Sequence, residues 1–156
     1  MRFHELPEDF EGHHPATEEG LRAALTMELE TAAGRCHQLP TELDYHPADP
    51  FVLRFTFHLP DETPVVWTVA RELLLAGLTA PAGEGDVRVR PHPAAPGLVQ
   101  LQLRSPTGAA ALGADAGALR EVLLRTELLV PLGAELDPAE LDAELARLLG
   151  ETAQEN

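Results

Sequence analysis

The chain has 156 residues, of which 44% are hydrophobic and only 4% aromatic. That length suits one domain whose core is built mainly from leucine, valine and alanine. The net charge of −15 comes from 11 arginines and 26 acidic residues, so duplex DNA and anionic lipid are poor default partners. A single cysteine, Cys36, excludes an internal disulfide and indicates a reducing compartment.

The charge and the turn-forming residues divide the chain into three parts. The first 20 residues carry one arginine and six acids with no regular hydrophobic period, which predicts a disordered acidic tail over 1–20. One domain is expected over 21–150 and a disordered C-terminus over 151–156. The sequence shows neither a signal-peptide core nor an apolar run of transmembrane length, so we expect a cytoplasmic protein.

The first half of the domain shows the alternation of apolar and polar residues that is typical of strands with one solvent-exposed face. The pattern is clearest where Phe51, Phe55 and Phe57 fall on one face and Arg54 falls on the other. The first three strands are predicted at residues 25–31, 41–45 and 51–59.

A hairpin loop over 60–64 should lead into a fourth strand at 65–69. Val65, Trp67 and Val69 are expected to line its buried side. A short helix is predicted next, over 70–76, because Gly77 is a typical C-terminal stop.

The second half repeats strands and then changes to helices. Alternation predicts strands at 86–90 and 99–104, and residues 107–113 are expected to add a weak edge strand. Two amphipathic helices follow, over 115–130 and 137–149, each starting at an aspartate in the N-cap position. The predicted fold class is therefore α+β, with antiparallel sheets and two C-terminal helices.

The residue patterns of common active sites are missing. The only serine, Ser105, lies at a strand end outside any nucleophile elbow. Cys36 and His37 are adjacent, so on an extended chain they point to opposite faces. Gly83 and Gly85 precede a strand in an acidic loop, where a phosphate loop would need a helix. The seven histidines lack metal-ligand spacing. We predict no catalysis, no metal and no cofactor.

Four arginines fall on the solvent-exposed faces of predicted strands and offer an alternative. If those faces join, they form a basic surface suited to single-stranded nucleic acid. Such binding also needs aromatic side chains for stacking, and the aromatic residues of the strands, Phe51, Phe55, Phe57 and Trp67, are expected to point inward. The competing interpretation is a solvated face on which Glu28 and Asp86 supply counter-charges. The four residues are Arg54, Arg88, Arg90 and Arg104.

The helix predicted over 115–130 carries two apolar stripes. The main stripe runs through Leu119 and Val122, and a second one runs through Leu124 and Leu128. A helix packed on a single sheet needs only one such stripe. The second stripe therefore needs another partner, which is either the C-terminal helix or a neighbouring subunit.

Four short motifs, in order along residues 21–150, resemble the pattern of the SsgA-like proteins. In that pattern a turn precedes a strand, a second motif joins a strand to the short helix, a third opens the next strand, and an Arg-Thr pair lies late in the long helix. The matching residues are Tyr45-His46-Pro47-Ala48-Asp49-Pro50-Phe51, Val66-Trp67-Thr68-Val69-Ala70-Arg71-Glu72-Leu73-Leu74, Gly83-Glu84-Gly85-Asp86-Val87-Arg88-Val89 and Leu124-Arg125-Thr126.

This resemblance implies a non-enzymatic regulator of sporulation in filamentous bacteria that helps to place the division machinery at septa. SsgB-type members engage the tubulin-like protein FtsZ, so FtsZ and other SsgA-like proteins are the expected partners. The resemblance also implies a Whirly-like fold, which binds single-stranded nucleic acid, and a homotrimer. Leu124 and Leu128 would then border an oligomer interface. Residues 1–20 are an extension relative to the family pattern.

Overall fold

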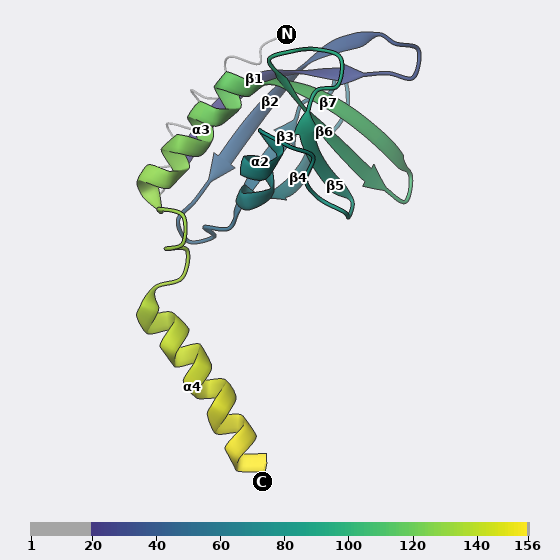
Figure 1. The fold of residues 1–156 in the computed structure, drawn as a ribbon. Helices are drawn as coiled ribbons and strands as arrows, with labels where there is room; N and C mark the ends of the chain where they lie inside the picture. The colour runs from purple at the N-terminus through teal and green to yellow at the C-terminus, as the bar shows by residue number, and fades with distance from the viewer. Residues whose placement is uncertain (1–19, 156) are drawn as a thin grey trace.

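The computed structural model describes residues 20–155, so the predicted tail lies almost wholly outside the described residues. The described chain forms one seven-stranded sheet and three helices (Figure 1). The α+β prediction is confirmed, with a single antiparallel sheet. The elements are β1 Leu21–Glu30, β2 Cys36–Tyr45, β3 Val52–Phe57, β4 Val65–Ala70, α2 Arg71–Gly77, β5 Val87–Pro91, β6 Leu98–Ser105, β7 Gly108–Asp115, α3 Ala116–Leu129 and α4 Pro138–Glu155.

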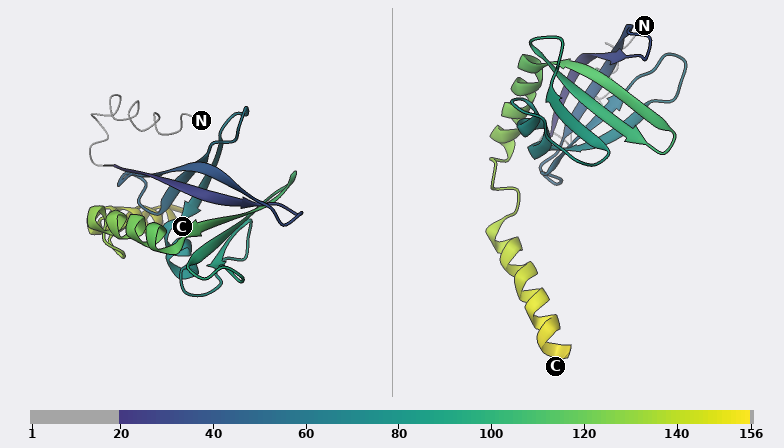
Figure 2. Two further views of the ribbon diagram at one scale, coloured as in Figure 1. Left: turned by 90° about the horizontal axis from the view of Figure 1, so that it is seen from above. Right: turned by 45° about the vertical axis from the view of Figure 1, so that its right-hand side comes forward.

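The strand order is β4-β3-β2-β1-β7-β6-β5, and every neighbouring pair is antiparallel. β1 and β2 pair along their whole length, from Leu21 opposite Tyr45 to Glu30 opposite Cys36. β1 and β7 pair only over residues 28–30 and 111–113. Seen from above, the two halves of the sheet diverge from this short junction, and α3 lies at the open side (Figure 2).

The core fills the space between the curled sheet and the two helices α2 and α3. Alternate residues of the strands point into it, as the period-two pattern predicts. The interior is mostly aliphatic with two phenylalanines, Phe55 and Phe57, whose ring centroids lie 6.0 Å apart. Its least exposed apolar members include Met27, Leu43, Leu53, Phe55, Leu74, Val89, Leu101, Leu119 and Leu123.

Helix α2 packs closely on β5 because Gly77 has no side chain where it meets Val89. A Cβ added to Gly77 would lie 2.3 Å from Val89 Cγ1 and 2.9 Å from the Val89 carbonyl carbon. Gly83 has φ +97°, which favours glycine, and an added Cβ there would lie 3.1 Å from Leu73 Cδ1. These two glycines bring α2 and the loop before β5 into direct contact.

Helix α3 begins at Asp115, whose carboxylate accepts a 2.8 Å hydrogen bond from the Ala118 amide. It buries the main stripe that the sequence predicted, with Leu119 fully covered. Helix α4 instead extends away from the sheet and from α3 (Figure 1), and it continues beyond Gly150 to Glu155. The predicted end of this helix at residue 149 is therefore wrong.

Other expectations are corrected by the structure. The weak edge strand predicted at 107–113 is β7, an interior strand between β1 and β6. Its alanines and glycines gave a faint hydrophobic signal, although it pairs with β6 over its whole length. Phe51 precedes β3 and is 48% exposed, and Val65 starts an edge strand and is 41% exposed, so neither belongs to the core. Trp67 packs against the core but is only partly buried.

Candidate functional site: a buried arginine junction and an exposed leucine surface

Arg71, the first residue of α2, is 1% exposed and ties three segments together. Its Nη1 donates to the Val130 carbonyl oxygen at 2.7 Å and to Thr126 Oγ1 at 3.3 Å. Its Nη2 donates to Glu135 Oε2 at 2.8 Å. The guanidinium carbon also lies 5.3 Å from the centre of the Tyr45 ring, within cation–π range. A charge buried to this degree needs such partners, and the structure provides them.

Three of the four family-like motifs meet at this junction. Tyr45 belongs to the turn motif, Arg71 to the strand–helix motif and Thr126 to the Arg-Thr pair. The turn itself is fixed because the Tyr45 hydroxyl donates to the Pro50 carbonyl and the Arg71 amide donates to the Phe51 carbonyl. The fourth motif contains Gly83, which lies close to Leu73 of α2. The motifs therefore build the setting of α2.

The junction also changes the ionisation of its neighbours. The hydrogen bond from Arg71 is the main cause that lowers the pKa of Glu135 below its ordinary value. Burial is the main cause that raises the pKa of Tyr45, although the charge of Arg71 opposes it. Glu135 is thus an anion at neutral pH, and it holds the segment between α3 and α4 against α2.

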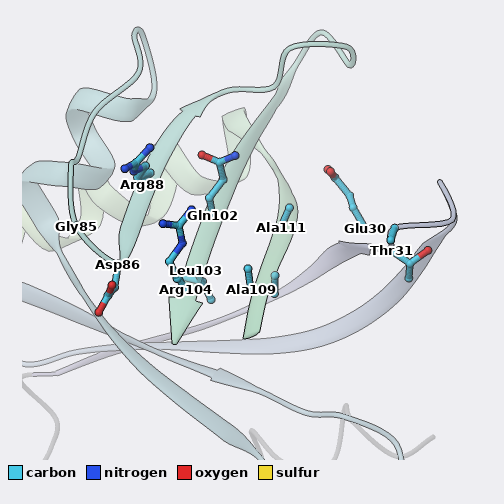
Figure 3. Close-up of a pocket in the computed structure, with 12 residues that line it drawn as sticks. Glu30, Thr31, Gly85, Asp86, Arg88, Gln102, Leu103, Arg104, Ala109 and Ala111 are labelled. Atoms are coloured by element: carbon cyan, nitrogen blue, oxygen red, sulfur yellow. The ribbon is translucent and has the colours of Figure 1, made fainter. Parts of the chain in front are cut away.

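Three of the four arginines proposed for a nucleic-acid face come together on β5 and β6, and Arg54 does not. Arg54 lies on β3, which β2, β1 and β7 separate from β6. Arg88 and Arg104 lie beside an open cavity of about 380 Å³ with Ala109 and Ala111 on its floor and Glu30 opposite (Figure 3). None of the described residues that line it is aromatic. The cavity carries both signs of charge and offers no stacking platform.

Arg90 belongs to a polar chain that crosses the sheet. Its Nε donates to Gln100 Oε1 at 2.9 Å, and Gln100 Nε2 donates to Glu30 Oε1 at 2.9 Å. Glu30 Oε2 is 2.7 Å from His92 Nε2, and the His92 Nδ1 accepts from the amides of the loop that follows. These contacts join β1 to β5 and β6, so Arg90 is committed to the fold.

The second stripe of α3 is exposed, as are the leucines that follow it. Leu124 is 53% exposed and Leu128 is 84% exposed, so α4 of the same chain does not cover them. The apolar face of α4 is exposed as well, with Leu145 at 49% and Leu148 at 54%. The structure therefore removes the alternative that α4 packs on its own α3 and leaves this stripe open.

The sequence patterns missed the junction and the polar chain. Arg71 lies within a recognised motif, but nothing in the pattern shows that its side chain is buried. Glu135 is separated from Arg71 by 64 residues and falls in a turn with no motif. The described part of the chain holds no group of three or more His, Cys, Asp or Glu side chains placed to bind a metal. Among residues 20–155, no helix combines the length and apolarity needed to cross a bilayer.

Comparison with known proteins gives a consistent result. The family described as "Streptomyces sporulation and cell division protein, SsgA" matches residues 39–135. The chain is 44% identical over 129 residues to the sporulation-specific cell division protein SsgB of Streptomyces coelicolor, covering 82% of this chain and 94% of that protein. SsgB of Thermobifida fusca is also 44% identical, over 112 residues that cover 71% of this chain and 81% of that protein.

A solved structure supports the same grouping. The SsgA-like sporulation-specific cell division protein from Thermobifida fusca superposes with a TM-score of 0.71 at 38% identity, covering 82% of this chain and 94% of that one. The chain belongs to the SsgA family of sporulation and cell division proteins.

Proposed function

We propose that this protein is a non-enzymatic regulator of sporulation-specific cell division that binds FtsZ and helps to position it at septa. The observation that carries the proposal is the likeness to SsgB of Streptomyces coelicolor. The two chains are 44% identical, and the matched region covers 94% of that protein. The relatives are named as sporulation-specific cell division proteins. The family-like motifs build the buried junction around Arg71, so we place the binding surface among the exposed leucines.

The assembly that we propose is a homotrimer in which Leu124 and Leu128 border the interface. Both side chains are exposed in a single chain, and apolar side chains repeated at helical spacing are typical of contact surfaces. A light-scattering mass near three times the chain mass of 16.8 kDa is expected for the wild type. Leu128→Glu should lower that mass at matched concentration, because it places a charge in the contact. A wild-type monomer would contradict the trimer.

Co-sedimentation with FtsZ polymers tests the partner. We expect the protein to pellet with assembled FtsZ and to stay in the supernatant when GTP is omitted. The protein without FtsZ is the control for self-sedimentation. Retention in the supernatant under both conditions would remove FtsZ as the direct partner, and fluorescent fusions in sporulating hyphae would test localisation at the septum.

Single-stranded nucleic acid is the alternative ligand. The family resemblance implies a Whirly-like fold, and folds of that type bind single-stranded nucleic acid. The separation of Arg54, the bonding of Arg90 to Gln100 and the carboxylate of Glu30 beside the cavity disfavour it. A binding assay with a single-stranded oligonucleotide at two salt concentrations provides the check. Affinity in the micromolar range that falls steeply with salt would overturn our preference.

A further inference from the structure

Exposed apolar side chains are concentrated in the C-terminal part of the described chain. Of the twelve large hydrophobic residues that are exposed among the described side chains, nine lie between 124 and 149. They occupy the outer stripe of α3, the connecting turn and one face of α4. Monomeric proteins rarely leave so much apolar surface open in one region. They are Leu124, Leu128, Leu129, Leu132, Leu136, Leu141, Leu145, Leu148 and Leu149.

Helix α4 needs a surface to pack against. Helix α4 has 18 residues, and most of the stability of helices in proteins comes from packing of an apolar face. Leu141 and Leu145 recur at helical spacing on one side of α4 and are 43% and 49% exposed. The helix therefore presents an apolar face that the described part of its own chain leaves exposed.

The turn between the helices directs α4 away from its own α3. Arg71 holds both ends of this turn, at the Val130 carbonyl oxygen and at the Glu135 carboxylate. Inside the turn, Glu135 Oε1 also accepts from the Gly133 amide at 2.9 Å, and Gly133 has φ +87°. With both ends fixed on α2, α4 leaves on the side opposite to α3 (Figure 1).

We infer that α4 of one copy packs on the Leu124–Leu128 stripe of α3 in a second copy of this chain. At 100° per residue, each edge of that stripe holds one arginine and one acid: Arg125 with Glu121 on one side, and Arg120 with Glu127 on the other. The edges of the α4 stripe hold only acids, Asp142 and Glu144. Placing α4 on α3 therefore gives each of these acids an arginine at the facing edge, whereas pairing α4 with another α4 would bring acids only to acids.

This contact joins two different surfaces, so each copy gives one helix and receives one. Such a head-to-tail arrangement closes into a ring when the rotation between copies permits. The inference rests on the proposed homo-oligomer and adds the two surfaces that form it. It also gives the rigid turn a role, because the Arg71 junction sets the direction in which α4 reaches the next subunit.

Disulfide trapping between full-length chains tests the contact. The exposed Cys36 is first replaced with serine, and Leu128→Cys and Leu145→Cys are then made in separate chains. Oxidation of the mixture should give a covalent dimer that neither chain forms alone. Trials with Leu124 in α3 and with Leu141 or Leu148 in α4 cover the neighbouring registers. Arg147→Cys, on the other side of α4, is the matched control and should not join to Leu128→Cys.

A chain that carries both Leu128→Cys and Leu145→Cys separates the possible occupants of the stripe. We expect covalent species of two and three chains on a non-reducing gel. A monomer with an internal disulfide would overturn the inference, because α4 would then fold back on its own α3. Dimers of Leu145→Cys or of Leu128→Cys alone would overturn it as well, as would a lack of any crosslink in all registers.

A reversible readout accompanies the crosslinks. Leu145→Glu in α4 and Leu128→Glu in α3 should each raise the concentration at which the oligomer dissociates by about tenfold or more, since each loses one buried leucine. Ala143→Glu, on the side of α4 opposite to its leucines, should leave it unchanged. These measurements need no FtsZ, so their outcome does not depend on whether FtsZ is the partner. A wild-type oligomer without α3–α4 crosslinks would remove this inference and leave the proposed function standing.

Discussion

Arg71 carries a full charge into the interior, which is costly unless every donor finds an acceptor. Two of its nitrogens have acceptors in the Val130 carbonyl, Thr126 and Glu135, while its Nε has none. The Tyr45 ring covers the guanidinium at 5.3 Å. Because Glu135 stays partly solvated, the pair avoids part of the desolvation cost that a fully buried pair would bear.

Removing the Arg71 charge should destabilise the fold. Arg71→Met keeps much of the volume but leaves the Val130 carbonyl oxygen without its donor. We expect a loss of about 2–4 kcal/mol, the range for an unsatisfied buried polar group together with imperfect packing. Urea unfolding monitored by circular dichroism measures it. Thr126→Val is the milder comparison at about 1 kcal/mol, and a smaller effect for Arg71→Met than for Thr126→Val would contradict this account of the junction.

Glu135 should make stability depend on acid. Its pKa is lowered in the folded state from an ordinary value of 4.5, chiefly by the hydrogen bond from Arg71. Its contribution is therefore fully present above the unfolded pKa and is lost as the pH falls through the lower folded value. We expect the stability difference between wild type and Glu135→Gln to be constant near neutral pH and to shrink below about pH 4.5. Unfolding curves at stepped pH measure this, and a difference that grows on acidification would reverse the sign.

At the scale of elements, period-two alternation predicted the strands well wherever large apolar side chains marked one face. It placed β3 by its phenylalanines and β6 by its leucines. It underrated β7, because alanine and glycine contribute little hydrophobic signal although they fit between two strands. The start of β1 and the long β2 were also shortened, because their pairing with each other, and not their own pattern, extends them.

The close packing of α2 on β5 depends on Gly77. Gly77→Ala would place a Cβ 2.3 Å from Val89 Cγ1, so α2 must shift away from β5. We expect a loss of about 1–3 kcal/mol from this overpacking. Gly150→Ala in α4 is the control, because nothing lies within 4 Å of its added Cβ, and it should leave stability unchanged or raise it slightly. Thermal unfolding measures the melting temperatures of the two variants. Equal values would show that α2 can shift away from β5 without loss of stability.

At the scale of the whole molecule, the sequence predicted two C-terminal helices but not where the second one lies. Direction depends on the turn that Arg71 fixes, and that contact joins residues far apart in the chain. The motifs located the right segments without showing that they face inward. Thus the resemblance identified the family, while the surfaces that we propose for assembly are inferred from the exposure of Leu124, Leu128 and the leucines of α4.

The acidic tail predicted over residues 1–20 should be dispensable for folding. It lies outside the described residues apart from Gly20, and its sequence has too few apolar residues to add to a core. Deleting residues 1–19 should leave the melting temperature nearly unchanged, by calorimetry at matched concentration. A fall of many degrees would mean that the tail packs on the domain.

The junction between β1 and β7 gives the sheet an uneven mechanical strength. Only three residue pairs join the two halves of the ladder there, whereas β1 and β2 share ten. Glu30 strengthens this junction, because its carboxylate reaches across β7 to His92 and to Gln100. We expect the pairing between β1 and β7 to open before the rest of the sheet, so its amides should exchange with solvent sooner than those of the hairpins on either side. Because α3 follows β7 directly, a force that a neighbouring subunit of the proposed ring exerts on α3 would act on the short β1–β7 pairing.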